Sequence, residues 1–369
     1  MADFSHYTGS NEAWLAAAAD LPPLPANLTL DERKKVLNDG REKTAAEGMK
    51  AFASQIKIQD HSIPTRDKSS VEARSYRPVN VDASKALPVY IHLHGGGFFF
   101  GTLASEDAIC ARIAINAQVV VLNVNYRHTP EHVYPVAWND TEDAFEWLHD
   151  HIELVGGDAQ NVVIGGISAG AQLTASFVLQ KHLGKVSASR PPIAGQVLMI
   201  PCLVNPECYE PQLKKLKDPS LSSYEQNKDA AILPMSVARF FTDSLKVENP
   251  QVDDVKLNPG NASPDQVKGL PPAVFGIAGW DILRDEGLLW AKLLSEVGVP
   301  TDINMFPGLP HGFRRVGNKL AASERWDQVM EKGITWALSK PTATHEFKVK
   351  TETRGTIAFL VLWYLDDSG

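Results

Sequence analysis

The sequence predicts an α/β protein with a mostly parallel central sheet, helices on both faces of that sheet and a helical cap. Apolar runs rich in β-branched residues alternate with helix-forming stretches from residue 87 to residue 340. This alternation is typical of parallel strands joined by crossover helices. A polar, proline-bearing stretch at 203–265 interrupts the pattern. An insertion of that length at the end of a strand is well placed to cover a ligand site.

The expected elements follow a regular order. Residues 1–53 have helical character, and Thr29 or Asp31 is the expected N-cap of the longer helix. Strands are expected at 56–67, 71–79, 87–94, 118–126, 162–164, 193–202, 273–279 and 302–306. Helices are expected at 106–117, from near Asn139 to 154, after 171, at 234–245, at 287–298 and at 325–339.

These elements divide the chain into three parts. Residues 1–53 form an N-terminal cap segment, residues 54–340 form the main domain with the cap insertion at 203–265, and residues 341–369 form a tail of unassigned role. The apolar run at 357–365 is shorter than the roughly 20 residues that span a bilayer. We interpret residues 341–369 as an added strand or a tail packed on the body of the protein. The alternatives are a contact with a second copy or a membrane surface, or an artefact of gene prediction.

Composition limits the compartment and the partners. The net charge of −8 and the absence of basic runs argue against a nucleic-acid partner. Neither a secretory signal nor a membrane span is recognisable, so we expect a cytoplasmic protein without stable membrane insertion. Three cysteines, an odd number, suit a reducing compartment. A bridge between Cys202 and Cys208 stays open as the less favoured alternative.

The stretch GGISAG, residues 165–170, is the centre of the predicted site. A β-branched run precedes it and a helix-forming run follows, so Ser168 lies at a sharp strand-to-helix turn. Gly166 and Gly170 allow the strand and the helix to pass close to the serine. The first helical N–H groups, led by that of Ala169, then point at whatever binds there.

A nucleophilic serine needs a base, and the base needs an acid to orient it. Asp281 follows one predicted strand and His311 follows the next, giving the chain order serine, acid, histidine that is typical of this turn. Asp285 and Glu286 lie close to Asp281 in the sequence. We favour Asp281, because Asp285 falls inside the next helix and faces elsewhere.

The glycine-rich stretch HGGG, residues 94–97, predicts an oxyanion hole. Bare backbone after a buried strand lets N–H groups approach a substrate oxygen, which side chains would prevent. The expected residues are Gly95, Gly96, Gly97 and Ala169, with Gly95 serving the turn. We interpret His94 as a structural brace of this loop.

Metal and nucleotide sites are not expected. Pro130 lies between His128 and His132 and breaks the helix that their spacing would need for metal binding. The sequence contains no H-E-x-x-H, no C-x-x-C and no G-x-G-x-x-G after a strand. We therefore expect neither a metal nor a cofactor.

Taken together, HGGGFFFG, NYRHTPEHVYPVAWND, GISAG, WDILRDEG and HGF resemble the hormone-sensitive-lipase-like esterases of the α/β-hydrolase fold-3 group over about residues 54–340. The resemblance implies a serine hydrolase of esters with Ser168, Asp281 and His311 as its triad. It also implies that Glu131 and Asp140 support loops. The chain departs from the family pattern at three positions. The family usually has aspartate where this chain has Ile167, glycine where it has Ala171 and aspartate where it has Asn125. These differences affect the polarity of the pocket rather than the triad.

The favoured function is therefore a serine carboxylesterase for short- to medium-chain or small aromatic esters. Alternatives are a dedicated deacetylase or lactonase, an acyltransferase of a biosynthetic pathway, and a non-catalytic small-molecule receptor. Plant hormone receptors of similar fold lack the histidine that His311 supplies, which favours an enzyme. The expected partner is a small-molecule ester, with a homodimer as an option. Six phenylalanines suggest an apolar pocket: Phe98, Phe99, Phe100, Phe240, Phe241 and Phe313.

Overall fold

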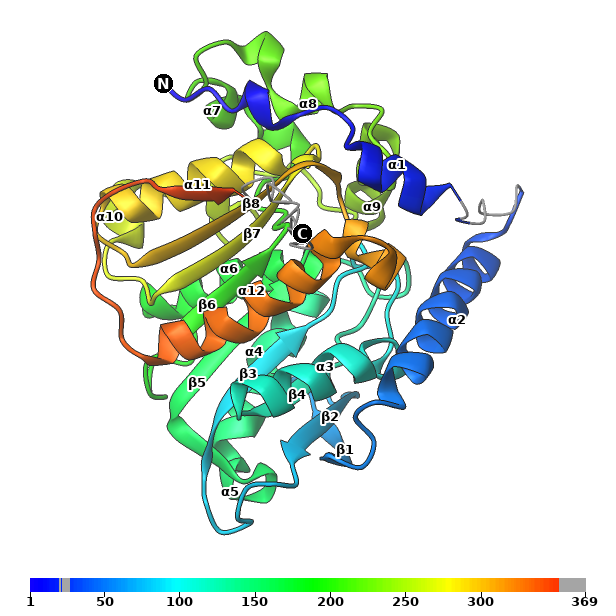
Figure 1. The fold of residues 1–369 in the computed structure, drawn as a ribbon. Coiled ribbons are helices and arrows are strands. Elements are labelled where there is room, and N and C mark those ends of the chain that lie inside the picture. The colour runs from blue at the N-terminus through cyan, green and yellow to red at the C-terminus, as the bar shows by residue number, and fades with distance from the viewer. Residues whose placement is uncertain (20, 22–26, 352–369) are drawn as a thin grey trace, which may run out of the picture.

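The computed structural model describes residues 1–19, 21 and 27–351. Within these residues one nine-stranded sheet runs through the molecule in the order β1-β2-β4-β3-β5-β6-β7-β8-β9 (Figure 1). Strand β2 is antiparallel to both of its neighbours, and every other pair is parallel. The strands are β1 (Ile56–Pro64), β2 (Ser70–Pro78), β3 (Leu87–Leu93), β4 (Val120–Val124), β5 (Gly157–Ile167), β6 (Gly195–Met199), β7 (Ala273–Trp280), β8 (Thr301–Pro310) and β9 (Val349–Thr351).

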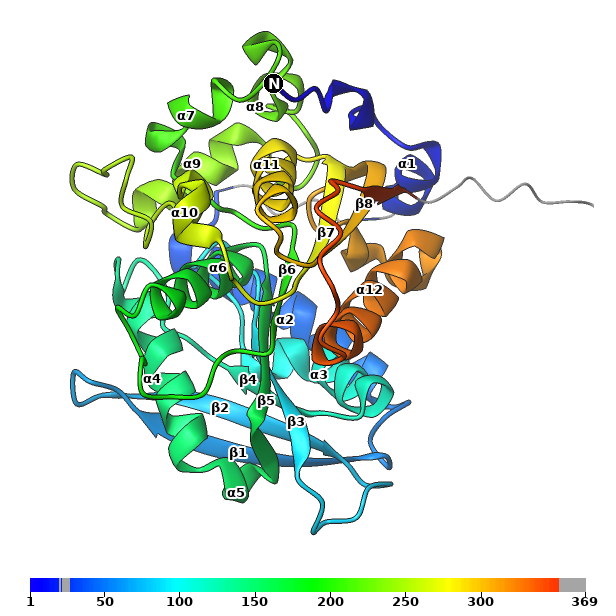
Figure 2. The same ribbon diagram turned by 90° about the vertical axis from the view of Figure 1, so that its left-hand side faces the viewer.

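Helices cover both faces of the sheet, as the alternating pattern predicted. Figure 2 shows α3 and α12 on one side of the strands and α4 and α6 on the other. All five residues of β4 and all five of β6 are buried, as expected for parallel strands enclosed on both faces. The bounds of these four helices are α3 (Leu103–Ala117), α4 (Val136–Asp150), α6 (Ala169–His182) and α12 (Ala321–Leu338), and α11, which follows β7, spans Arg284–Glu296.

The two predicted cap segments contact each other. Ala2 and Leu216 form an isolated parallel bridge, in which the Ala2 N–H donates to the Lys215 carbonyl and the Lys217 N–H donates to the Ala2 carbonyl. The N-terminal strand-like segment therefore runs beside the insertion, as Figure 1 shows near the label N. The helices here are α1 (Glu12–Ala18), α2 (Leu30–Met49), α7 (Glu210–Leu213), α8 (Ser223–Gln226), α9 (Met235–Ser244) and α10 (Pro264–Val267).

Helix α2 begins at Leu30, and its N-cap is Thr29, one of the two predicted N-cap residues. The Thr29 hydroxyl accepts the Glu32 N–H, and the Glu32 carboxylate accepts the Thr29 N–H. This reciprocal capping box satisfies two backbone donors at once, and it starts the helix three residues after the described chain resumes at Asn27.

Three details differ from or add to the prediction. Helix α4 begins at Val136 rather than near Asn139, because Pro135 fits the residue before a helix, where its missing N–H costs nothing. The tail contributes β9, which pairs in parallel with β8, while the apolar run at 357–365 lies outside the described residues.

All three cysteines are free thiols, so the alternative Cys202–Cys208 bridge does not form.

Among the residues described, no helix combines the length and the apolar character needed to cross a membrane.

The turn between β5 and α6 brings three backbone segments into close contact. A Cβ at Gly170 would collide with the carbonyl oxygen of Leu93 at the end of β3, and a Cβ at Gly166 would collide with the backbone of Gly170. The absence of side chains at these two positions therefore sets how closely α6 approaches β3.

We expect Gly170→Ala to lower the free energy of unfolding by about 1–3 kcal/mol. The added methyl group would collide with the backbone of Leu93, which cannot move away easily. Gly40→Ala is the matched control. Gly40 lies inside α2 with no atom near its virtual Cβ, so alanine there should raise stability by about 0.5–1 kcal/mol. Urea denaturation of both variants checks the pair, and equal effects would contradict the close-contact interpretation.

Candidate active site

Ser168 occupies the strained position at the start of α6. Its backbone angles are φ 55° and ψ −116°, a region that residues with a side chain rarely adopt. Its N–H donates to the Met199 carbonyl at 2.8 Å, which fixes the turn against the end of β6. The serine hydroxyl makes no capping bond to its own helix and is left to face the loops that follow β7 and β8.

Those two loops supply His311 and Asp281. His311 Nε2 lies 3.0 Å from Ser168 Oγ, and His311 Nδ1 lies 2.7 Å from Asp281 Oδ2. The second carboxylate oxygen, Oδ1, accepts the Leu283 N–H at 3.0 Å. A carboxylate acts only as an acceptor, so Nδ1 carries the ring proton and Nε2 presents its lone pair to the serine hydroxyl.

This chain of side chains is largely removed from water. Asp281 is 1% exposed and His311 is 8% exposed. In such surroundings hydrogen bonds between polar groups are stronger than in water. The arrangement can therefore transfer a proton from Ser168 to His311 and hold the resulting imidazolium beside the Asp281 carboxylate.

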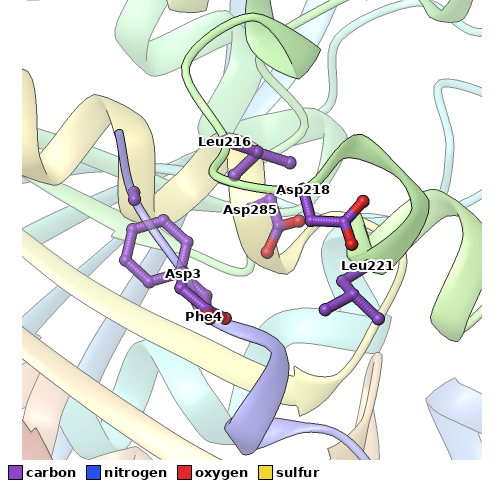
Figure 3. Close-up of a pocket in the computed structure, with 7 residues that line it drawn as sticks. Asp3, Phe4, Leu216, Asp218, Leu221 and Asp285 are labelled. Atoms are coloured by element: carbon purple, nitrogen blue, oxygen red, sulfur yellow. The ribbon is translucent and has the colours of Figure 1, made fainter.

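Asp285, the alternative acid, has other partners. Its Oδ1 accepts Arg284 Nε at 2.7 Å and its Oδ2 accepts the Ser223 N–H at 2.6 Å. Figure 3 shows Asp285 beside a crevice of about 10 Å³ between the N-terminal segment and the insertion. That volume is about what one water molecule needs, and neither Ser168 nor His311 lines it. The structure thus brings Asp281, and not Asp285, to His311.

The predicted glycine loop lies against the residue before Ser168. A Cβ at Gly95 would lie 2.9 Å from the Ile167 carbonyl oxygen. Gly96 and Gly97 have φ of 142° and 61°, which glycine adopts without strain. Within the described part of the chain, the N–H groups of Gly96, Gly97 and Ala169 make no hydrogen bond. These free donors are the kind of group that could bind a substrate oxygen.

Two histidines, His94 and His128, support the glycine loop. His94 Nδ1 donates to the Gly95 carbonyl at 3.1 Å, and its Nε2 lies 3.3 Å from His128 Nε2. Burial lowers the pKa of His94 to about 4, so the ring is neutral at pH 7. The Tyr126 hydroxyl donates to the His94 carbonyl at 2.7 Å. These contacts give His94 the bracing position that the sequence predicted.

Glu131 and Asp140 also make contacts of the supporting kind. Glu131 pairs with Lys34 of α2 at 2.7 Å. The Asp140 carboxylate accepts the Arg127 N–H at 2.9 Å and the Arg127 guanidinium at 2.6 Å. Both carboxylates therefore fix the segment that follows β4. Within the described ranges, no three His, Cys, Asp or Glu side chains gather in a way that could hold a metal ion.

The six phenylalanines separate into two groups. Phe98 stacks on Trp138 at 4.9 Å, and Phe313 packs against Phe306 and Trp326, so these two belong to the core. The others form one aromatic cluster between the glycine loop and α9, made of Phe99, Phe100, Phe240 and Phe241. The Phe241 ring occupies the space that a Cβ at Gly97 would take.

Sequence reasoning missed two residues next to the site. Arg41 of α2 donates to the Gly95 carbonyl at 2.8 Å. Asn227, which follows α8, donates to the backbone carbonyl of Asp281 at 2.8 Å. Neither belongs to a motif, and both partners lie 54 residues away in the chain, so no local pattern could have identified them.

The chain is similar in sequence and fold to several known proteins. A family model of the α/β-hydrolase fold matches residues 90–315. The esterase LipI of Mycobacterium tuberculosis is 32% identical over 66% of this chain and 71% of its own length. The ethyl acetate hydrolase of Pseudomonas putida is 30% identical over 71% of this chain and 77% of its own length. The crystal structure of vibralactone cyclase superposes with a TM-score of 0.81 at 25% identity, covering 92% of this chain and 97% of the cyclase.

The family match spans more than half of the residues, and the motifs of the glycine loop, the serine turn and the histidine loop lie within it. The chain therefore belongs to the α/β-hydrolase fold-3 family of hormone-sensitive-lipase-like esterases.

Proposed function

We propose that this protein is a serine carboxylesterase in which Ser168 is the nucleophile, His311 the general base and acid, and Asp281 the residue that orients His311. The observation that carries the proposal is the unbroken path of hydrogen bonds, 3.0 Å from Ser168 Oγ to His311 and 2.7 Å from His311 to Asp281. Named esterases among the relatives give it further support.

The reaction has two halves. In the first, His311 Nε2 takes the Ser168 proton while Oγ attacks the ester carbonyl carbon, and the N–H groups of Gly96, Gly97 and Ala169 bind the oxyanion. His311 then gives the proton to the departing alcohol, which leaves an acyl-serine. In the second half, His311 takes a proton from water, the hydroxide oxygen attacks the acyl carbon, and the proton returns to Ser168 as the carboxylic acid leaves.

The pocket is proposed to accept short- to medium-chain or small aromatic esters. The aromatic cluster Phe99, Phe100, Phe240 and Phe241 lies directly beside the glycine loop, so it borders the expected position of the ester group. Aromatic walls favour compact apolar groups. A homodimer and a cytoplasmic location stay predictions from the sequence.

A second candidate is acyl transfer, including closure of a lactone, in a biosynthetic pathway. The likeness to vibralactone cyclase favours it. The first half-reaction would be the same, and an alcohol would replace water in the second. Product analysis with and without an added alcohol distinguishes the two, because transfer yields a new ester and hydrolysis yields only the acid.

Ser168→Ala should lower kcat for p-nitrophenyl butyrate by at least about 10³-fold, since loss of one member of such a triad removes most of its contribution. A fluorophosphonate should attach its phosphonyl group to the native protein, with loss of fluoride, and should leave the mass of the variant unchanged. Ser54→Ala, at an exposed serine, should behave as wild type. Ester turnover that persists in Ser168→Ala would refute the assignment of the nucleophile.

Asp281→Asn should lower kcat by about 10³–10⁴-fold with little change in stability, because an amide favours the wrong His311 tautomer. Asp285→Asn is the matched comparison. It disturbs buried bonds to Arg284 and Ser223, so it should lower the melting temperature while kcat stays within about tenfold of wild type. If the two variants exchanged these behaviours, Asp285 would be the acid. Steady-state kinetics and thermal melts on the same samples measure both.

Phe241→Ala should raise kcat/KM for p-nitrophenyl octanoate relative to the acetate by about 10-fold or more, since it opens space for several methylene groups beside Gly97. Phe240→Ala provides the comparison, because its ring stands edge to face on Phe99 at 5.3 Å and not on the glycine loop. An unchanged chain-length profile in Phe241→Ala would place the acyl pocket elsewhere.

A further inference from the structure

The Gly95 carbonyl oxygen accepts hydrogen bonds from two side chains. Arg41 Nη1 lies 2.8 Å away and His94 Nδ1 lies 3.1 Å away. His94 is the residue before Gly95 in the chain, whereas Arg41 comes from the cap helix α2. This carbonyl is therefore fixed by the body of the protein and by the cap together.

The opposite end of the same peptide is a proposed oxyanion donor. The Gly95–Gly96 peptide is trans, since the cis bonds of the described chain precede Pro130 and Pro135. In a trans peptide the N–H points away from the carbonyl. The Gly96 N–H thus points away from Arg41, and it makes no hydrogen bond with any described residue. A hydrogen bond at the carbonyl polarises the amide, which makes its N–H a stronger donor.

Arg41 has a fixed orientation. Its Nη2 forms an ion pair with Glu106, a carboxylate that is 3% exposed. Burial alone would raise the pKa of Glu106, but Arg41 and His92 outweigh it and lower that pKa to about 2. The guanidinium also lies over the Phe100 ring, 5.4 Å from its centroid. The planar guanidinium fork thus bridges Glu106 and the Gly95 carbonyl, which a lysine ammonium could not do in the same way.

Two more bonds join α2 to Gly101 and Thr102, which lie between the glycine loop and α3. The Asn38 side chain accepts the Gly101 N–H at 2.9 Å, and the Glu42 carboxylate accepts the Thr102 hydroxyl at 2.7 Å. Asn38, Arg41 and Glu42 lie within one helical turn, so they face the loop together. Docking of α2 therefore fixes both the glycine loop, through Gly95, and the segment that follows it, through Gly101 and Thr102.

We propose that Arg41 is a positioning residue for the oxyanion hole: it orients and polarises the Gly95–Gly96 peptide so that the Gly96 N–H stabilises the reaction's oxyanion. This inference rests on the proposed esterase function and extends it to the cap. It makes the docking of α2 a condition for full activity, because the same helix carries the guanidinium that completes the loop.

The kinetic test compares Arg41→Met and Arg41→Lys with wild type. Both variants should lose at least about 10-fold in kcat with KM nearly unchanged, less than the 10²–10³-fold that removal of a donor costs. Affinity for a trifluoromethyl ketone, which forms an oxyanion on Ser168, should fall by the same factor as kcat/KM. Guanidinium at millimolar concentration should restore part of the Arg41→Met rate. The control Lys43→Met changes an exposed lysine of the same helix and should leave all values unchanged.

A second measurement does not depend on catalysis. The sequence contains four Gly–Gly peptide bonds, at 95–96, 96–97, 156–157 and 165–166. Protein labelled with glycine carrying ¹³C at the carbonyl and ¹⁵N therefore gives four signals in a carbonyl-selected amide spectrum. In Arg41→Met the Gly96 amide proton should move upfield, because its peptide is less polarised, while Gly157 and Gly166 stay in place and report an intact fold.

An unmoved Gly96 signal, or a folded Arg41→Met variant with wild-type kcat and trifluoromethyl ketone affinity, would overturn the proposal. A rise in KM with an unchanged kcat would also overturn it, since that result would assign Arg41 to substrate binding. Failure of the esterase function looks different. In that case wild type turns over no ester and binds no trifluoromethyl ketone, while the Gly96 signal still responds to the substitution.

Discussion

Helix α6 can reach the end of β3 only because Gly170 leaves the Leu93 carbonyl unobstructed. That close approach places the first turn of α6 beside the glycine loop, where Gly95 lies against the carbonyl of Ile167, the residue before Ser168. A wider separation would leave a serine at a turn and a loop of glycines with no common position for a substrate oxygen. The proposed chemistry therefore depends on the absence of one side chain at a backbone crossing.

The serine, histidine and acid reach one another by a different route. Each lies after the carboxyl end of a parallel strand, β5, β8 or β7, where neighbouring strands deliver their loops to one edge of the sheet. Burial then makes each bond matter. Asp281 has both carboxylate oxygens occupied, by His311 and by the Leu283 N–H, so removing one member leaves a buried group of the next without its hydrogen bond.

The local parts of this arrangement were predictable from the sequence and the distant ones were not. The turn at Ser168, the glycine loop and the order of Asp281 and His311 follow from short patterns at strand ends. Arg41 is one of many charged residues on α2, and Asn227 lies in an irregular insertion, so neither stands out. Their contacts arise only when segments 54 residues apart are packed together. The start of α4 was misplaced by three residues, because helix boundaries depend on tertiary contacts that a sequence pattern does not contain. An added strand in the tail was expected, and the structure has it at β9, paired with β8.

The two predicted cap segments also form hydrogen bonds to residues of the proposed site. The Thr8 hydroxyl bonds to Asn227, and Asn227 bonds to the backbone of Asp281, while Arg41 reaches the Gly95 carbonyl. Caps are the parts of such enzymes that one would exchange between relatives to change selectivity. In this molecule, a cap from a relative would also have to supply two hydrogen bonds to the proposed site. These are the bond from Arg41 to the Gly95 carbonyl and the bond from Asn227 to the Asp281 carbonyl. Exchanging these segments between relatives would therefore need Arg41 and Asn227 to be kept together with their partners in the core.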